Sequence, residues 1–335
     1  MPLQPPLPPL ITPYVSSQPE NSLTLISSIL GATSNWLVLR FLHAALRQES
    51  NNASLGFDEP HGSKRPVVLV SFLRGWEFWK AEAKRLGIDL GRLTDKKEFA
   101  FVDGLSELFS GPQPASVSTP PAVNIGQVRT TLPLRSAGAV PGRSPIPTQP
   151  TDRSNVPKQT QTGPGIAKKL HFTGRGVAAL DALEHDIINV IMGLNGEKAL
   201  LIIDQPDLLL AATGESLDIG ATEMTEWIKG LQEKVYATVM TLAADSPLVH
   251  NASASRMQVA SPIESGHAAF AIALAHRARS VMQLRTLETG AARDVSGVLR
   301  ISRGGGWTEE NLDEKELLYY IQRDGGVKVF GRGES

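Results

Sequence analysis

A short apolar run that ends on an acid constrains this chain most: Ala199–Ile203 (ALLII), followed by Asp204. A continuous apolar run of this length is typical of a strand buried on both faces of a parallel sheet. An acid directly after such a strand lies at the carboxyl edge, where open α/β folds bind ligands, and in nucleotide-hydrolysing folds it helps to hold Mg²⁺. The alternative is that Asp204 only begins a turn before Pro206, which biases Gln205 away from helix. The sequence alone leaves both interpretations open.

The composition is that of a globular protein without cysteine chemistry. Of the 335 residues, 41% are hydrophobic and 20% are charged, and the net charge of −1 gives no general attraction to nucleic acid or membranes. The absence of cysteine excludes disulfides, thiol nucleophiles and cysteine-based zinc sites. The apolar runs are shorter than the ~20 residues of a spanning helix, so we expect no membrane partner. We expect a cytoplasmic and nuclear protein.

The N-terminus is rich in proline. Met1–Leu10 lacks the basic start and the unbroken apolar core of a signal peptide. We predict an extended, polyproline-like arm over residues 1–20 and a single domain over residues 21–335.

Beyond the arm, apolar strands alternate with helical patterns, which is typical of parallel βα units. The predicted strands are Ser22–Ser27, Val67–Ser71, Phe99–Asp103, Ala199–Ile203 and Val235–Leu242. The first predicted helix covers about Trp36–Arg47 and is capped by Ser34 or Asn35, and the last two cover Ala221–Glu233 and Glu264–Ala275. A second helix is predicted from one face that carries Trp76, Trp79, Ala83 and Leu86. A third is predicted from an apolar face of Val177, Leu180, Leu183, Ile187, Val190, Ile191 and Leu194. We interpret the tryptophans as core residues, with base-stacking platforms as the minor alternative.

A basic, proline-rich segment interrupts the domain at about residues 111–170. Eleven of the 23 prolines lie between Pro112 and Pro164. Residues 112–169 carry seven Lys or Arg and one acid, Asp152, so their net charge is +6. Such a composition cannot bury enough apolar surface to offset its ordering entropy. We predict a disordered insertion that acts as a solubilising linker, with weak contact to nucleic acid as the alternative.

The C-terminal part changes character. Residues 280–287 and 295–302 alternate apolar with polar side chains, and Leu317–Gln322 and Val327–Phe330 flank the hairpin signal Arg323–Gly326. Parallel βα units followed by an antiparallel meander on the same sheet are the layout of a RecA-like ATPase core. The predicted fold class is therefore α/β, a RecA-like core of mostly parallel sheet, flanked by helices, with a C-terminal antiparallel meander.

The phosphate-binding loop of such a core is missing. The pattern G-x-x-x-x-G-K-[ST] uses backbone N–H groups and a lysine to cradle phosphates. Aligned with it, Ser28 and Thr33 replace the glycines, Ser34 replaces the lysine, and Asn35 replaces the hydroxyl residue that binds magnesium. We therefore predict degenerate nucleotide-site positions at Ser34, Asn35 and Asp204, no cofactor and no catalytic residue.

Four segments resemble the sixth Elongator subunit family of fungi. They cover Asn35–Leu42, Ser71–Lys80, Leu201–Leu210 and Asp294–Gly305. The resemblance extends over nearly all of the chain outside the arm and the insertion, although none of these segments is a catalytic signature.

The resemblance implies a RecA-like subunit without a phosphate loop. Such a subunit alternates with Elongator subunits four and five in a heterohexameric ring. The ring binds tRNA in an ATP-sensitive way and, with the remaining Elongator subunits, supports modification of the wobble uridine. The resemblance thus implies no enzyme activity of this chain alone, although hydrolysis of ATP at ring level stays possible.

Two alternatives stay open. One is an active ATPase with an atypical loop, with Asp204 on Mg²⁺ and Asp103 as the base. The other is a pure scaffold without tRNA contact. Of the two loops expected to face a central channel, Gln205–Ser216 has no basic residue, whereas Ala243–Pro262 offers His250 and Arg256 as candidate tRNA contacts. The simpler interpretation of Arg256 is an ordinary solvated residue.

Overall fold

The computed structural model describes residues 7–16, 18–46, 64–110, 165–249, 260–287, 294–306 and 312–332. All of them belong to one compact unit, formed from Met1–Gly111 and Thr162–Ser335.

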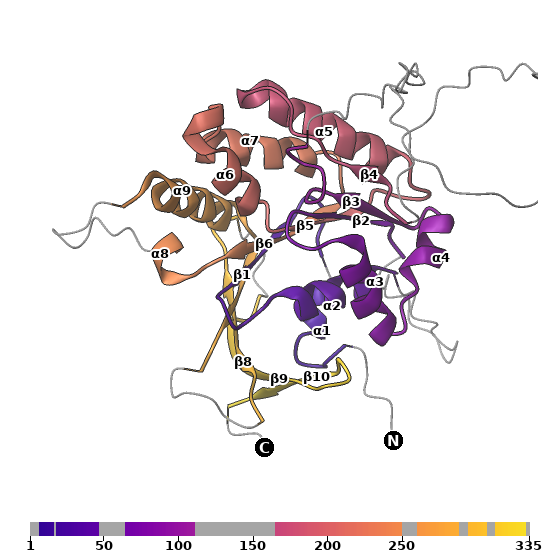
Figure 1. Ribbon diagram of the computed structural model, residues 1–335. Coiled ribbons are helices and arrows are strands. Elements are labelled where there is room, and N and C mark those ends of the chain that lie inside the picture. Colours follow the sequence, from indigo (N-terminus) through magenta and orange to yellow (C-terminus); the bar gives the residue numbers. More distant parts are fainter. Residues whose placement is uncertain are drawn as a thin grey trace, which may run out of the picture. The chain divides into compact units, whose positions relative to one another are not determined.

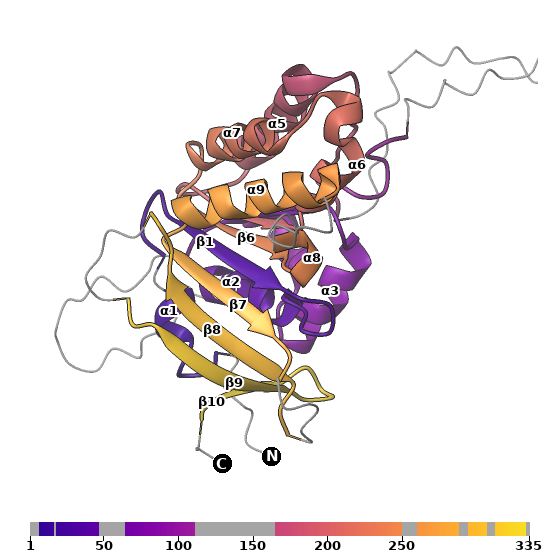
Figure 2. The same ribbon diagram turned by 90° about the vertical axis from the view of Figure 1, so that its left-hand side faces the viewer.

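Ten strands of this unit form one sheet, in the order β10-β9-β8-β7-β1-β6-β5-β2-β3-β4 (Figure 1). Neighbouring strands are parallel from β7 to β4 and antiparallel from β7 to β10. Figure 2 shows the antiparallel strands as the continuation of the parallel sheet. The strands are β1 Leu23–Ser28, β2 Val67–Ser71, β3 Phe99–Asp103, β4 Lys168–Lys169, β5 Leu200–Asp204, β6 Ala237–Ala243, β7 Ser280–Arg285, β8 Gly297–Arg303, β9 Lys315–Ile321 and β10 Val327–Gly331.

Helices cover both faces of the parallel strands (Figures 1 and 2). One layer consists of α1 Thr12–Ser16, α2 Asn35–Leu46, α3 Trp76–Arg85 and α4 Leu90–Asp95, and the other of α5 Gly176–Met192, α6 Asp207–Thr213, α7 Ala221–Gln232 and α9 Pro262–Arg277. The 3₁₀ turn Gly214–Leu217 follows α6, and α8 Ser246–Val249 follows β6.

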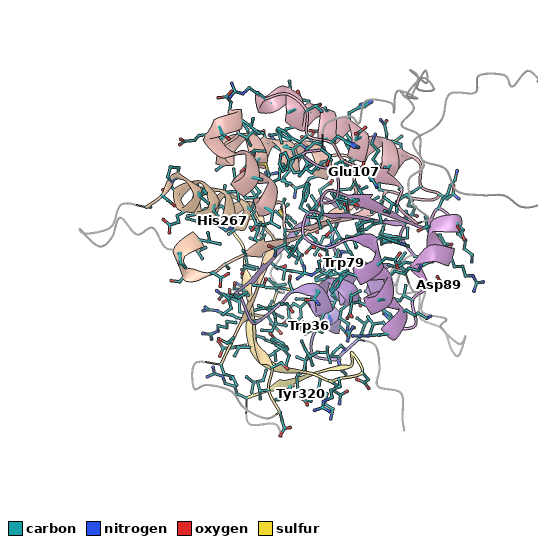
Figure 3. The ribbon with its side chains drawn as sticks, viewed as in Figure 1. Trp36, Trp79, Asp89, Glu107, His267 and Tyr320 are labelled. Carbon is teal, nitrogen blue, oxygen red and sulfur yellow. The ribbon has the colours of Figure 1, made fainter. Side chains whose placement is uncertain are left out.

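Two hydrophobic cores lie on opposite sides of the sheet. Successive side chains of a strand point to opposite faces, so Val67 and Leu69 pack with the first helix layer, and Val68 and Val70 with the second. Trp36 and Trp79 belong to the first core, where Trp36 lies 5.0 Å from the ring of Tyr319 in the meander (Figure 3). The meander is therefore part of the same core as α2.

The predicted fold class is confirmed: the unit is α/β, with a mostly parallel sheet, flanking helices and a C-terminal antiparallel meander. The bounds of β2 and β3 match the prediction, and the hairpin signal lies between β9 and β10. The core interpretation of Trp76 and Trp79 is also correct, because both side chains are buried against β3 and its neighbours. No helix of the described residues is both long and apolar enough to span a membrane.

The extended arm predicted over residues 1–20 is wrong where the structure describes it. Thr12–Ser16 forms α1, and the side chains of Ile11, Tyr14 and Val15 are buried against the first core. The Tyr14 hydroxyl donates a 2.8 Å hydrogen bond to the carbonyl of Asp313, which precedes β9. The apolar side chains between the prolines thus bury enough surface to order this segment.

Two local expectations about helices are also wrong. Neither Ser34 nor Asn35 caps α2 with its side chain: Ser34 Oγ and Asn35 Oδ1 are buried and have no hydrogen-bond partner among the described residues. The backbone carbonyl of Ser34 instead accepts from the N–H groups of Leu37 and Val38, at 3.0 and 3.1 Å. On α5, Val177 is exposed rather than part of the apolar face, because it lies in the first turn, at the edge of the sheet.

Candidate functional site

Strand register brings Asp204 and its partners to the carboxyl edge of the sheet. Asp204 ends β5 and lies between Ser71 at the end of β2 and Thr241 in β6. Asp103 ends β3 on the other side of Ser71. Because parallel strands end at the same edge, two acids and two hydroxyls meet where α/β folds bind ligands.

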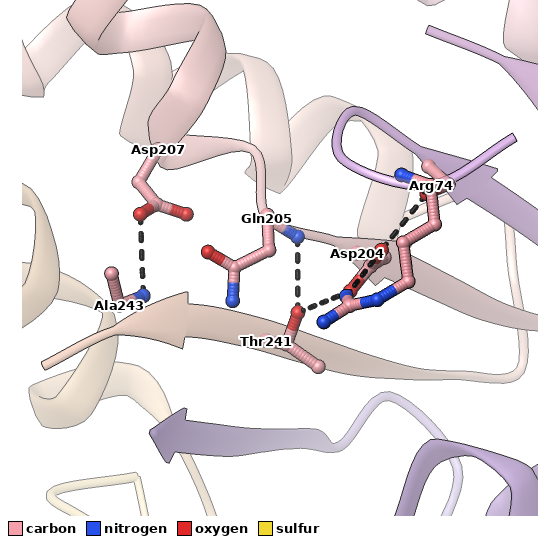
Figure 4. A network of polar contacts seen from close by, with 7 residues as sticks. Arg74, Asp204, Gln205, Asp207, Thr241 and Ala243 are labelled. Atoms are coloured by element: carbon pink, nitrogen blue, oxygen red, sulfur yellow. Dashed lines mark hydrogen bonds and ion pairs between the residues drawn. The ribbon is translucent and has the colours of Figure 1, made fainter. Parts of the chain in front are cut away.

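Asp204 is completely buried, and protein donors engage both of its oxygens. Ser71 Oγ donates to Oδ2 at 2.8 Å, and Thr241 Oγ1 donates to Oδ1 at 2.9 Å. Arg74 Nη1 lies 3.3 Å from each carboxylate oxygen (Figure 4). Thr241 Oγ1 also accepts from the N–H of Gln205, whose φ of 57° turns the chain sharply after the strand.

The electrostatics of Asp204 fit a structural network better than a cation site. Burial raises the pKa of Asp204, and the charge of Arg74 and the donated hydrogen bonds oppose this shift without cancelling it. A magnesium ion at this carboxylate would have to displace Arg74 or one of the hydroxyls. The residues present therefore do not fit the Mg²⁺ role that the apolar run and its acid suggested.

Asp103 acts as a turn residue. Its Oδ1 accepts from the N–H groups of Leu105 and Ser106, both at 2.9 Å, and its side chain is buried. This is the hydrogen-bonding pattern of an Asx turn, which directs the chain away from β3. The geometry gives Asp103 a local structural role, whether or not it also acts as a base.

The loop between β1 and α2 does not present Ser34 to a ligand. Ser34, at the place of the lysine, is 1% exposed and directed into the protein. A residue after β6 fixes the backbone of this loop instead: the N–H of Leu30 donates to Asp245 Oδ1 at 2.9 Å. The left-handed glycine of the loop is Gly31, with φ of 95°, and it does not coincide with either glycine of the phosphate-loop pattern.

A second buried acid at this edge pairs with a histidine that the sequence did not single out. His267 Nε2 lies 3.2 Å from Asp207 Oδ2, and Nδ1 lies 3.0 Å from the carbonyl oxygen of Leu248 (Figure 3). Both neighbours are acceptors, so both ring nitrogens donate, as they do in an imidazolium. Burial lowers the pKa of His267, but the hydrogen bond and charge of Asp207 and the hydrogen bond to Leu248 outweigh it and raise the pKa above its ordinary value.

The same edge exposes a set of large apolar side chains. Leu30 is 89% exposed in the loop after β1, and Leu73 is 40% exposed after β2. Of the nine exposed large hydrophobic residues in the described part of the chain, seven lie after parallel strands or in the first turn of the following helix: Leu30, Leu73, Leu105, Phe109, Val177, Leu208 and Ile263. Exposed apolar side chains at one edge of a sheet can be buried by contact with another protein. We call these seven residues the apolar edge.

Of the two loops expected to face a central channel, the first is largely helical and the second is described only in part. Gln205–Ser216 is no open loop, because α6 begins at Asp207 and the 3₁₀ turn follows it. In Ala243–Pro262 the structure describes α8 and Ser261, whereas His250 and Arg256 lie outside the described residues. Among the described residues, no group of three or more His, Asp or Glu side chains could hold a metal ion.

Comparisons with protein-family models and with curated proteins find no match to this chain.

Proposed function

We propose that this chain is a non-catalytic RecA-like subunit of a heterohexameric ring. In that ring it alternates with Elongator subunits four and five, binds tRNA jointly with them and supports wobble-uridine modification by the remaining Elongator subunits. The observation that carries the proposal is the state of Asp204: the acid in the nucleotide position is buried by Ser71, Arg74 and Thr241. Ser34, in the lysine position, is buried as well.

The apolar edge supports the assembly part of the proposal. A nucleotide site needs polar donors and a fixed cation at this edge, whereas Leu30, Leu73 and Leu105 present hydrocarbon to solvent. Burying them against a neighbouring subunit would remove apolar area from water at about 25 cal/mol per Å². The edge thus fits contact with protein better than contact with phosphate.

Assembly is tested by co-expressing the chain with Elongator subunits four and five and measuring the mass of the purified complex. Leu73→Glu and Leu105→Glu should each abolish the heterohexamer while the isolated chain stays folded, because a buried unpaired carboxylate opposes association. Ile272→Glu is the matched control, since Ile272 is 50% exposed in the middle of α9 and outside the apolar edge. A wild-type chain that forms no complex, or edge variants that assemble as the control does, would contradict the proposal.

Catalysis is tested separately by phosphate release from ATP. The isolated chain should release none, because no lysine or magnesium-binding hydroxyl occupies the phosphate-loop positions. Turnover that disappears on Asp204→Asn would instead establish the atypical ATPase. Hydrolysis that needs the assembled ring agrees with the proposal, because neighbouring subunits can supply the missing groups.

The tRNA part rests on the segment around His250 and Arg256. Binding of the assembled ring to several tRNAs is measured at two salt concentrations for the wild type and for His250→Ala and Arg256→Ala. Loss of a phosphate contact by Arg256 should weaken binding similarly for all tRNAs and lower the salt slope by about one per site. If the tRNA affinity and the salt slope of the variant rings are unchanged, other residues of the ring contact the tRNA. A ring that binds no tRNA would favour the pure scaffold.

A further inference from the structure

A buried arginine of α2 has no counter-charge among the described residues. Arg40, in the middle of α2, is 2% exposed, although arginine is almost never fully buried unless it is paired. Its guanidinium donates one long hydrogen bond within the described part of the chain, from Nη2 to the carbonyl oxygen of Gly325 at 3.4 Å. Its Nε is buried without a partner, and no carboxylate of the described residues forms an ion pair with it.

A cavity of about 80 Å³ is lined in part by Arg40. It lies between α2, α3 and the turn that joins β9 to β10, and its polar lining comes from Asn35, Arg40, Glu82, Arg85, Gln322 and Gly325. A space of this size holds water and has room for a carboxyl group. Arg85 is half exposed, so the cavity lies close to the surface.

The charges around the cavity leave one positive charge unbalanced. Glu82 is 2.9 Å from Arg85 and neutralises that residue, so it is already engaged. Burial lowers the pKa of Arg40 to about 10, and no acid of the described residues opposes the shift. A buried charge without a partner is strongly unfavourable, and a planar guanidinium matches a carboxylate with two parallel hydrogen bonds. One monovalent, planar anion would satisfy both the charge and the unused donors.

We propose that this cavity is a binding site for a single carboxylate, held by Arg40. A phosphate, with up to two charges, exceeds the one unbalanced charge. Asn35, whose Oδ1 has no partner, can contribute an N–H₂ donor after a half-turn of its amide. The carboxylate comes either from a small free acid or from an acidic side chain of a partner protein, and both sources share this chemistry.

The test uses the full chain and two probes. Sodium acetate represents a free acid, and the peptide acetyl-Ala-Glu-Ala-amide represents a protein side chain, each compared with sodium chloride at equal ionic strength. Acetate or the peptide should raise the melting temperature of the wild type above the chloride control, and titration should give saturable binding. The probe that binds more tightly identifies the source.

Substitutions assign the effect to Arg40. Arg40→Met should weaken binding by about tenfold to a hundredfold, the effect of losing hydrogen bonds to a charged group, and Arg40→Lys should fall between it and the wild type. Without added carboxylate, Arg40→Met should melt at or above the wild-type temperature, because it removes an unpaired buried charge. The double variant Glu226→Gln, Lys229→Gln removes an exposed ion pair on α7 that does not line the cavity, and it should leave binding within about threefold of the wild type, as surface pairs contribute little.

Two results would overturn the proposal. The first is a wild-type protein whose melting temperature and titrations respond to acetate and to the peptide no differently than to chloride. The second is carboxylate binding that survives in Arg40→Met. The Arg40→Lys variant keeps the test decisive if Arg40→Met does not fold. None of these readouts depends on ring assembly, ATP or tRNA, so this proposal and the proposed function can fail independently.

Discussion

His267 Nε2 and Asp207 Oδ2 lie 3.2 Å apart, with both side chains nearly fully buried. The pair joins α9 to α6, and the second ring nitrogen of His267 joins α9 to α8 through the carbonyl of Leu248. Three helices at the carboxyl edge thus meet at one imidazole ring. The pair carries the clearest pH dependence of the described residues.

We expect stability to fall with rising pH in a way that depends on His267. The folded-state pKa of His267 is raised, so the protonated ring stabilises the fold fully below the ordinary histidine pKa of about 6.5. This contribution is lost as the pH rises through the raised pKa. Urea unfolding, followed by tryptophan fluorescence at several pH values, should show a steeper loss for the wild type than for His267→Gln. Parallel curves for the two proteins would exclude this role.

Removing the acid of the pair should cost more than removing the base. In Asp207→Asn the imidazolium stays buried without a counter-charge at low pH, and breaking a buried ion pair in this way costs about 3 kcal/mol or more. The deficit should shrink as the pH rises and the ring becomes neutral. The deficit is the difference in unfolding free energy between the wild type and Asp207→Asn, measured at pH values below and above the titration of His267. An equal deficit at both pH values would show that charge is not the cause.

Thr241 should matter for stability through its hydroxyl alone. In Thr241→Val, Gln205 N–H is left without its buried partner and Asp204 Oδ1 keeps only Arg74, so we expect a loss of about 1–3 kcal/mol. Thr241→Ser keeps the hydroxyl and is the matched control, with a much smaller loss expected. Chemical unfolding of both variants gives the comparison, and equal losses would mean that the methyl group, not the hydroxyl, is important.

Two glycines near α9 should respond to alanine in opposite directions. Gly305 donates its N–H to the carbonyl of Ala275 at 3.0 Å, and a Cβ at Gly305 would lie 2.4 Å from the carbonyl oxygen of His276. Gly305→Ala should therefore lower the unfolding free energy by about 2 kcal/mol or more. A Cβ added to Gly266, inside α9, would meet no neighbouring group within 4 Å, so Gly266→Ala should raise it by about 0.5–1 kcal/mol. A melting-temperature shift in the same direction for both would refute this account.

The strands were the most predictable part of the fold. Val67–Ser71 and Phe99–Asp103 are apolar runs bounded by polar residues, so the sequence itself indicates their burial on two faces. The N-terminal helix α1 was not predictable, because the prolines around it favour an extended chain. Its three apolar side chains are buried only through tertiary contact with the core around α2, which the local sequence does not show. Likewise α6 starts one residue after Pro206, where a turn signal predicts a loop.

At the candidate site, the sequence predicted the position of Asp204 but not its environment. Ser71 and Thr241 lie 133 and 37 residues away and reach Asp204 only through strand register. The Asp207–His267 pair spans 60 residues, and no local spacing marks it. The burial of the Ser34 side chain was not predictable either, because a serine before a helix usually caps it, whereas this one points into the protein.

The insertion should be dispensable for folding, whereas the residues just after it should not. Replacing Pro112–Gln161 by a flexible linker of about eight residues keeps every described contact, and a shorter loop should leave the unfolding free energy unchanged or raise it by about 1–2 kcal/mol. The comparison variant extends the replacement to Lys169. It removes β4, the ion pairs of Lys168 with Asp186 and of Lys169 with Glu107, and the N–H of Ala167 that bonds to Phe101.

The longer replacement should destabilise the fold strongly, because it leaves the edge of β3 open and uncovers buried side chains next to it. Unfolding of both variants by urea, with ring assembly as a second readout, separates the two segments. If the shorter replacement unfolds the chain, the proline-rich segment belongs to the core, and the prediction of an insertion within a single domain is wrong. If both replacements are tolerated, β4 contributes little, and the sheet is stable with β3 as its edge strand.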